Sequence, residues 1–466
     1  MTRQFEKPDY EAMLHKTIQV GEALPEEHLA RFVVKVISLL DLESIYGQYA
    51  KVGGKAIAPE VLLGLLVYGY ASGVFSSRKI ERATYENLAF QYVAGGLHPD
   101  HDTLANFRKT FLAQIQELFV QVLLLAQEVG VLKVGNISLD GSKIQADASK
   151  SKAVSHKRLL QLEDQLRAEV HELLSLGESA DQSEVILPGG LVIADEITRR
   201  QLRLENLAKA KAVLEARAQE RYAAEKAEYE AKVKERAEKA KRKGRRLGGK
   251  PPQPPDPGPR DKDQYNFTDP DSRVMKNSTD DGFDQHYNAQ VAVDQASLLI
   301  VACSLSNHPN DKAEAEPTLA ALSPQLGQVP DYRQGQVDAA ALDNGFFSPT
   351  NIQACLERGI EPYIATGRQP HHPRWQTFFA PAAEPPPDNA SPKLKMAFKL
   401  QTEPGREIYR LRKCTVEPVI GIIKEVLGFR QFSLRGLRAA AGEWSLVCLA
   451  FNLKRLHHLD PQAALA

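Results

Sequence analysis

The sequence is poor in the residues that build thiolate metal sites and disulfide frameworks. Only four cysteines occur among 466 residues, and they are widely spaced, at Cys303, Cys355, Cys414 and Cys448. They form no Cys-x-x-Cys pair and no cluster with histidine, so neither a zinc site nor a disulfide framework is expected. Reduced thiols in a cytosolic protein are the simplest interpretation.

The chain also lacks a net charge and long apolar runs. Its 59 basic residues balance its 59 acidic ones, so the total charge gives no argument for a nucleic-acid partner. No signal peptide or membrane-spanning run is found, and no membrane partner is expected. The hydrophobic content of 43% and the charged content of 25% are those of globular proteins, and 466 residues suffice for two or three domains.

The N-terminal quarter predicts short helices. Residues 1–24 carry weak signals and are interpreted as a flexible arm, whereas 25–130 shows apolar residues at helical spacing. One predicted helix carries three basic residues, Arg78, Lys79 and Arg82, and a second, after the turn at 98–103, carries Arg108 and Lys109. Such helices could contact DNA or simply present solvated basic faces, and the residues alone leave both open.

The pattern changes to strands at 131–150, the first part of a predicted sheet domain. Residues 137–140 predict a short strand that ends in Asp140, Gly141 supplies a turn, and 143–147 alternates as a second strand. An aspartate at a strand end is displayed above the sheet, although a turn-forming Asp before Gly is common.

A helical insertion is predicted at 151–262. Residues 194–243 indicate one long helix or a helical hairpin, and Pro-rich 251–259 is a linker. The helix ends in a run without acidic members: Lys239, Lys241, Arg242, Lys243, Arg245 and Arg246. This basic arm either is a solvated helix end or grips phosphates or a second copy of the chain.

Strands resume in the second part of the sheet domain, 263–457, before a tail at 458–466. A hairpin with a turn near 295–297 is followed by a strand with two aspartates, Asp338 and Asp343. Asp343 has the terminal place, where ligands gather at the edge of open α/β sheets. Asp338 is expected at the other end of that strand, about 17 Å away. A fifth strand at 360–365 and a loop at 366–404 follow.

A helix is predicted from about 415, with Thr415 as its cap and Pro418 in its first turn. Glu417 then lies near its N-terminus, Lys424 lies two turns on, and Tyr409 and Arg412 precede it. A carboxylate beside cationic and hydroxyl groups suits metal-assisted phosphoryl transfer. A solvated helix with ordinary charges is the alternative.

The spacing Tyr409-x2-Arg412-x4-Glu417-x6-Lys424 resembles the Tyr-Arg-Glu-Lys signature of bacterial insertion-sequence transposases of the DDE class. The stretches 73–82 and 99–108 resemble the N-terminal domain of the same transposases, which is taken to contact the terminal DNA of the element. The stretch 139–150 resembles their first-aspartate block and 343–348 their second, with Asn344 and Phe346 as departures.

The resemblance implies an α/β fold: a ribonuclease H-like mixed sheet, interrupted by a long helical insertion and preceded by an all-helical N-terminal domain. It implies that Asp140, Asp343 and Glu417 hold two Mg²⁺ ions, or Mn²⁺ in their place, with Asp147 as a lesser candidate. Arg412 and Lys424 would position phosphates, and Tyr409 would orient them.

The implied partners are double-stranded DNA, as element ends and target, and a second copy of the chain on that DNA. The implied location is the cytoplasm, at the nucleoid. Two other functions stay open at this point: a ribonuclease H-like nuclease without strand transfer, and a DNA-binding derivative without catalysis.

Overall fold

The computed structural model describes most of the chain, namely residues 15, 17–50, 55–183, 192–244, 248–277, 282–327, 337–367, 384–387 and 389–459. Most of the predicted flexible arm and tail lies outside these residues, as do Arg245, Arg246 and the side chain of Lys243.

The chain forms two compact units. Unit 1 comprises Met1–Asp147, Asn277–Asp281 and His286–Ala466, and unit 2 comprises Ala148–Lys276 and Gly282–Gln285. The predicted helical module at 25–130 and most of the sheet thus belong to one unit, and the predicted insertion belongs to the other.

The first part of unit 1 is helical. Its helices are α2 (Val20–Ala23), α3 (Leu29–Leu39), α4 (Glu43–Tyr46), α5 (Pro59–Ala71), α6 (Ser77–Glu86), α7 (Leu88–Val93), α8 (His101–Thr110) and α9 (Leu112–Glu128). The Asp100 side chain caps α8 by accepting from Thr103 N, as an aspartate before a helix often does. The last long helix, α16 (Leu437–Leu459), packs against both α5 and α9, so the two ends of the chain share one core.

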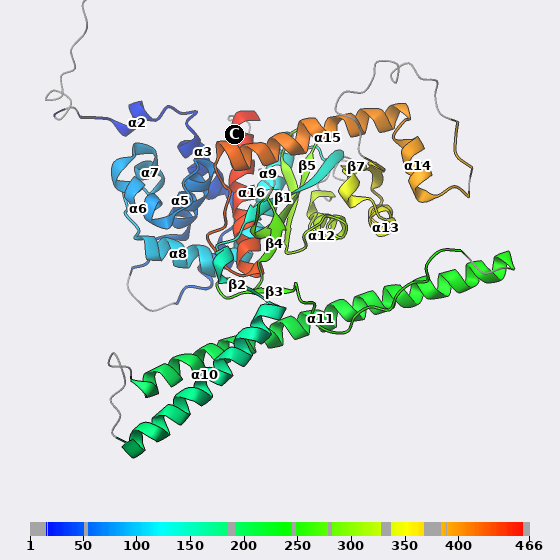
Figure 1. Ribbon diagram of the computed structural model, residues 1–466. Coiled ribbons are helices and arrows are strands. Elements are labelled where there is room, and N and C mark those ends of the chain that lie inside the picture. The colour runs from blue at the N-terminus through cyan, green and yellow to red at the C-terminus, as the bar shows by residue number, and fades with distance from the viewer. Residues whose placement is uncertain are drawn as a thin grey trace, which may run out of the picture. The chain divides into compact units, whose positions relative to one another are not determined.

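A mixed sheet forms the centre of unit 1 (Figure 1). Its strands β1 (Asn136–Gln145), β5 (Phe283–Asp294), β6 (Ile300–Ser306), β7 (Ala339–Leu342) and β8 (Glu361–Ile364) are ordered β6-β5-β1-β7-β8, and β4 (Arg273–Lys276) also pairs with β5. β5 is antiparallel to β1 and β6, whereas β7 is parallel to β1 and β8.

Helices pack on this sheet. α15 (Glu403–Gly421) contacts β1, β7 and β8, and α16 contacts β6. α12 (Ala315–Ala320) packs on β6, while α13 (Pro349–Glu357) and α14 (Pro392–Lys399) pack on β8. Among the described residues no single helix is long and apolar enough to cross a membrane; the bent pair α8 and α9 passes by length and composition only.

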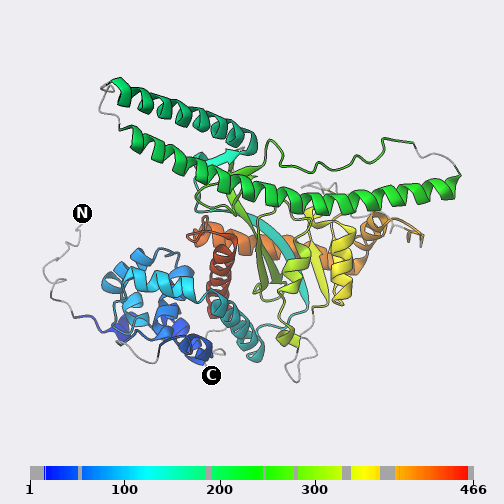
Figure 2. The same ribbon diagram turned by 90° about the horizontal axis from the view of Figure 1, so that it is seen from below.

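Unit 2 is a helical hairpin with a two-stranded sheet at its base (Figure 2). α10 (His156–Ser183) packs along α11 (Ile193–Lys243), and β2 (Ala153–Ser155) pairs with β3 (Gln264–Asn266). Leucines at helical spacing meet in its core, and Lys211 pairs with Glu163 at 3.1 Å across the hairpin. α11 has 51 residues, and a helix of that length extends about 75 Å.

The predicted break of the first strand at Asp140 is wrong. β1 runs without interruption from Asn136 to Gln145, and Asp140 pairs with Val291 in its middle. A Cβ at Gly141 would lie 2.1 Å from Nε2 of Gln290, so a larger residue there would force the Gln290 side chain to move. The Asp140-Gly141 pair, which the sequence predicts as a turn, therefore lies within a continuous strand, and the Gln290 amide lies over Gly141.

The predicted start of the helix at Thr415 is also wrong. Thr402 caps α15 by accepting from Gly405 N, Pro404 occupies the first turn, and Pro418 lies inside the helix. The predicted loop at 366–404 contains α14 among its described residues. A π-helical turn, Ile422–Val426, follows Pro418. As a result Tyr409, Arg412 and Glu417 all project from a single helix.

Candidate active site

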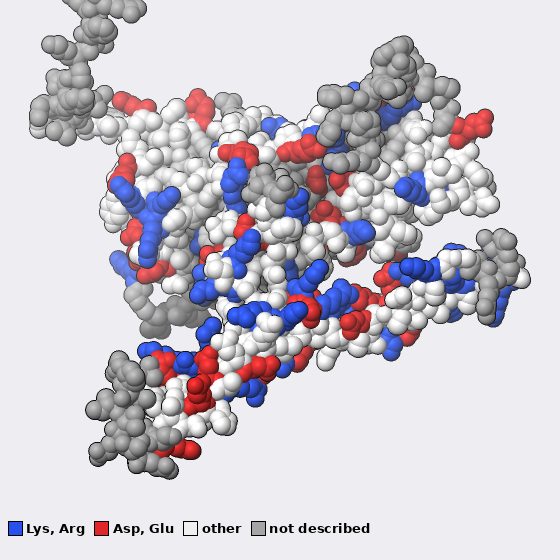
Figure 3. All heavy atoms as spheres, viewed as in Figure 1, with Lys and Arg blue, Asp and Glu red and all other residues white. Residues whose placement is uncertain are grey.

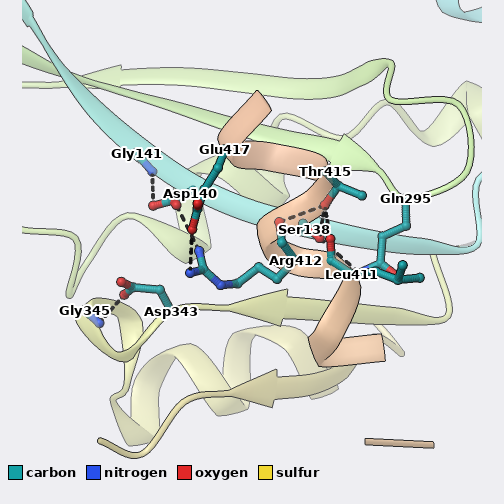
Figure 4. A network of polar contacts seen from close by, with 10 residues as sticks. All are labelled: Ser138, Asp140, Gly141, Gln295, Asp343, Gly345, Leu411, Arg412, Thr415 and Glu417. Atoms are coloured by element: carbon teal, nitrogen blue, oxygen red, sulfur yellow. Dashed lines mark hydrogen bonds and ion pairs between the residues drawn. The ribbon is translucent and has the colours of Figure 1, made fainter. Parts of the chain in front are cut away.

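Arg412 joins two of the predicted carboxylates. Its Nη1 donates to Asp140 Oδ2 at 2.9 Å, and its Nη2 donates to Glu417 Oε1 at 3.3 Å (Figure 4). The Arg412 side chain is 7% exposed and that of Asp140 22%, whereas that of Glu417 is 51% exposed. The site is therefore buried on the side of β1 and open on the side of Glu417.

The parallel pairing of β1 and β7 brings Asp343 next to Asp140. Leu139 pairs with Leu342, so the residue that follows each leucine emerges at the same place on neighbouring strands. The Asp343 carboxylate accepts from Gly345 N in the short turn that follows β7 (Figure 4). Asp343 also interacts electrostatically with Asp140 and Arg412.

Asp338 lies at the opposite end of β7, as the sequence predicts. Its N–H donates to Gly135 O at 2.8 Å, next to the start of β1. There it lines a hollow of about 410 Å³ together with Lys133, Asn136 and Asp294. The structure thus does not bring Asp338 to the carboxylates around Arg412.

Burial dominates the electrostatics of Asp140. It raises the pKa of this carboxyl to about 6, although Arg412 and the Gly141 N–H both favour the ionised form. Burial lowers the pKa of Arg412, but Asp140, Tyr409, Asp343 and Glu417 outweigh it and the net pKa is raised. Arg412 therefore stays charged, whereas the Asp140 carboxyl gains or loses its proton at about pH 6.

A hydrogen-bonded anchor fixes α15 on β1. Thr415 Oγ1 donates to Ser138 Oγ at 2.8 Å, which makes Thr415 a docking residue rather than a cap. Gln295 Nε2 donates to the same hydroxyl at 3.0 Å and to Ile408 O at 3.1 Å. Ser138 precedes Asp140 by two residues on the same face of the strand, so the anchor sets the position of Arg412 against Asp140.

The two remaining signature residues flank this centre. The Tyr409 ring lies one turn before Arg412, with its centroid 6.0 Å from the guanidinium carbon, and burial raises the pKa of its hydroxyl. Lys424, in the π-helical turn, reaches Ser142 Oγ at 3.1 Å on β1. Burial lowers the pKa of this amine. π-helical turns inside α-helices are frequent at functional sites.

Asp311 is a residue of this region that the sequence did not single out. Its Oδ1 accepts from Asn288 Nδ2 and Gln290 Nε2, both at 2.8 Å, from two buried side chains of β5. A methyl group built on Gly345 would lie 2.9 Å from Asp343 Oδ1 and 3.4 Å from Asp311 Oδ2. The sequence signal that could have identified it is an aspartate that follows a strand after a few residues.

The donor chemistry of the three carboxylates suits a hard divalent cation, because Mg²⁺ prefers carboxylate oxygens. Their arrangement, however, does not close around one ion. Among the described residues no group of three His, Cys, Asp or Glu side chains could hold a metal together. The Arg412 guanidinium, instead, stands between Asp140 and Glu417.

Three of the predicted DNA-binding residues are exposed on α6. Arg78, Lys79 and Arg82 all have exposed side chains, and Arg82 forms an ion pair with Glu86 one turn later. In Figure 3, basic side chains gather over this helix. Lys241 and Arg242 are likewise exposed, near the end of α11, and Lys239 pairs with Glu235.

The prediction that Arg108 contacts DNA is wrong. Its side chain is 7% exposed, and Nη1 donates to Tyr70 OH at 2.7 Å and to Phe75 O at 3.2 Å. The same nitrogen lies 3.7 Å from Glu443 Oε1, in a carboxylate that is fully buried. Arg108 lies on the buried face of α8, between α5 and α16, because helical spacing places it beside Leu104 and Phe107.

Comparison with known families identifies two segments. Residues 19–110 match the family described as Transposase domain (DUF772), and residues 387–457 match the family described as Transposase DDE domain. The second segment contains all four residues of the Tyr409–Lys424 signature. No curated protein and no solved structure matches the chain.

Proposed function

The chain is a DDE transposase of the insertion-sequence type, and from this premise we propose that Asp140, Asp343 and Glu417 are the carboxylates of its catalytic centre. The proposal rests on the packing of α15 against β1 and β7. The parallel pairing of these strands places Asp140 and Asp343 on neighbouring strands, and Arg412 on α15 forms ion pairs with both Asp140 and Glu417. No observation favours a nuclease without strand transfer or a derivative without catalysis.

The fold supports the same assignment. In the described sheet, three antiparallel strands, β6-β5-β1, are followed by two strands parallel to β1, with the insertion between β1 and β5. We propose that this is a ribonuclease H-like core. Open sheets of this kind present their ligand sites at the carboxyl ends of parallel strands, which is where Asp343 lies.

DDE transposases use divalent metal ions, and we propose two Mg²⁺ ions, which would polarise the scissile phosphodiester and lower the pKa of an attacking water. Asp140, Asp343 and Glu417 would hold them. The remaining chemistry belongs to the side chains around them. Lys424 and Arg412 would hold phosphate oxygens, and Tyr409 would orient Arg412 by packing beside its guanidinium.

Two basic surfaces would bind parts of the DNA other than the scissile phosphodiester. Arg78 and Arg82 lie one turn apart on α6 and would grip the backbone of the element end, with Lys79 beside them. Lys241 and Arg242, near the end of α11, would add phosphate contacts without sequence preference. We further propose that two copies act together on DNA, in the cytoplasm at the nucleoid.

The test uses the protein, Mg²⁺ and a duplex that contains the DNA flanking its gene. Asp140→Asn, Asp343→Asn and Glu417→Gln should each abolish cleavage at defined ends and leave binding of that duplex within about twofold. Asp338→Asn, on the same strand as Asp343 but at its other end, is the matched control and should cut normally. Normal cleavage by any of the three variants would remove that residue from the centre.

A further inference from the structure

Helix α6 carries an exposed aromatic residue on the same face as two of its cations. Arg78, Arg82 and Tyr85 follow one another at intervals of four and three residues, so they lie within about 60° around the helix axis. The buried residues Ile80 and Thr84 lie on the opposite face. The Tyr85 side chain is 59% exposed. A phenol ring presents a large apolar surface, so a partner that covers Tyr85 gains binding free energy.

His98 holds the Tyr85 ring in one orientation. The two rings stack, with their centroids 4.0 Å apart and an interplanar angle of 11°. His98 is itself anchored, because its Nδ1 lies 3.0 Å from Oγ1 of the buried Thr84. The Thr84 hydroxyl donates to Glu81 O at 2.7 Å, so the imidazole N–H is the donor in the contact with Thr84. The stack therefore orders the Tyr85 side chain and covers one face of its ring.

The dimensions and charges of this face suit the major groove of DNA. Arg78 and Tyr85 are seven residues apart, which is about 10 Å along a helix and about three base pairs along a duplex. The ion pair of Arg82 with Glu86 is exposed to solvent, and such pairs contribute little, so a phosphate can replace Glu86. The major groove admits a helix, and its one apolar group is the thymine methyl. An aromatic ring beside two phosphate-binding arginines is therefore placed to contact that methyl group.

We propose that Tyr85 is a specificity-determining residue of this transposase, whose ring contacts a thymine methyl group of the element end, and that His98 positions the ring. The inference rests on the proposed function of α6, whose cations bind the backbone of the same DNA. Phosphate contacts carry no sequence information, so α6 needs a base contact to distinguish the element end from other DNA. A ring that is already ordered loses little side-chain entropy on binding, which strengthens this contact.

The experiment measures binding of the full chain by fluorescence anisotropy to two labelled duplexes. One contains the DNA that flanks the gene, and the other has the same composition in shuffled order. Tyr85→Ala should lower the ratio of the two Kd values about fivefold, as the loss of one base contact implies, and leave binding of the shuffled duplex within about twofold. Tyr46→Ala is the matched control, since Tyr46 is 48% exposed on α4, and should keep the ratio of wild type.

Replacing single thymines of the flanking duplex with uracil removes only the methyl group. At one position or more, wild type should bind the uracil duplex about threefold more weakly, whereas Tyr85→Ala should bind both duplexes equally. Tyr85→Phe keeps the ring and should behave as wild type does. His98→Ala should lose part of the discrimination between flanking and shuffled DNA, because it frees the Tyr85 ring.

Equal weakening of both duplexes by Tyr85→Ala, or no weakening of either, would overturn the proposal. A response to uracil that persists in Tyr85→Ala would overturn it as well. The urea midpoint of Tyr85→Ala should match that of wild type, because the ring is exposed; if it does not, Tyr85→Gln, which suits a helix, decides by the same ratio.

Arg78→Gln separates this inference from the proposed function on which it rests. That variant should weaken binding of both duplexes alike, because a phosphate contact has no sequence preference. Unchanged binding of both would refute the backbone contacts of α6 and the inference together. Failure at Tyr85 alone would leave those contacts standing. The carboxylate assignment is independent of either result, since cleavage rather than binding tests it.

Discussion

Replacing Arg108 distinguishes a DNA-binding residue from a buried structural one. In the structure, Arg108 Nη1 is shared by Tyr70 OH at 2.7 Å, Phe75 O at 3.2 Å and Glu443 Oε1 at 3.7 Å. Arg108→Met would keep the apolar stem but remove the charge that balances a fully buried carboxylate. The variant should leave DNA binding by the folded protein unchanged and lower the free energy of unfolding.

The expected loss of stability depends on the hydrogen bonds that Glu443 keeps in the variant. Breaking a buried ion pair by removing one partner costs about 3–5 kcal/mol. Glu443 would retain three donors, namely Tyr70 OH at 2.8 Å, Ser433 N at 2.8 Å and Leu434 N at 3.0 Å. These donors compensate part of the loss, so we expect about 3 kcal/mol. The double variant Arg108→Met/Glu443→Gln should recover at least about 1 kcal/mol, because partners in one network are coupled.

Urea denaturation measures the stability, and fluorescence anisotropy with a labelled duplex measures DNA binding. Lys109→Met, the exposed neighbour, should stay within about 0.5 kcal/mol of wild type. If Arg108→Met were as stable as wild type and bound DNA more weakly, Arg108 would face the DNA and its buried contacts with Tyr70 and Glu443 would be wrong.

Three further predictions concern other parts of the chain. The folded state raises the pKa of Asp140 from 3.8 to about 6, which favours its protonated form. In chelating buffer, wild type should therefore lose up to about 3 kcal/mol of stability relative to Asp140→Asn as the pH rises from 4 to 7; a constant difference in urea denaturation would contradict this. Gly141→Ala should destabilise by about 1–3 kcal/mol, because its methyl group would overlap the Gln290 amide, and Gln290→Ser should relieve this; no relief in the double variant would mean another contact is responsible. Replacing Lys239, Lys241, Arg242, Lys243, Arg245 and Arg246 with Gln should weaken binding to any duplex and flatten its salt dependence, and an unchanged slope would leave the basic arm a solvated helix end.

Local patterns predicted those elements whose own residues carry the signal. Residues 194–243, rich in Ala, Glu, Lys and Arg, predict one long helix or a helical hairpin, and α11 spans Ile193–Lys243 as one helix. The continuous apolar run before Asp343 predicts a strand with that aspartate at its end, and β7 ends at Leu342. Such signals work because helix and strand periodicity depend on neighbours in the sequence.

Three local signals were misleading because distant residues overrode them. Asp140-Gly141 resembles a turn, yet the strand continues, since β5 pairs with β1 from Ile137 to Gln145 and places Gln290 over the glycine. Pro418 resembles a helix start, yet α15 begins at Glu403, and its packing on β1, β7 and β8 supports the helix through the proline. Arg108 resembles a surface cation, yet its contacts with Tyr70 and Glu443 show that it is buried.

The sequence by itself determined the residue types of the proposed catalytic centre and their order along the chain. The spacing of the four signature residues, Tyr409, Arg412, Glu417 and Lys424, resembles that of a known transposase signature. Asp140 and Asp343 each follow an apolar stretch that predicts a strand. Only the tertiary structure decided what these residues contact. Arg412 donates a hydrogen bond to Asp140, which lies 272 positions away in the sequence, and Asp311 accepts one from Gln290 on β5. No sequence periodicity encodes these encounters, because they depend on the pairing of strands and on the docking of α15 against them.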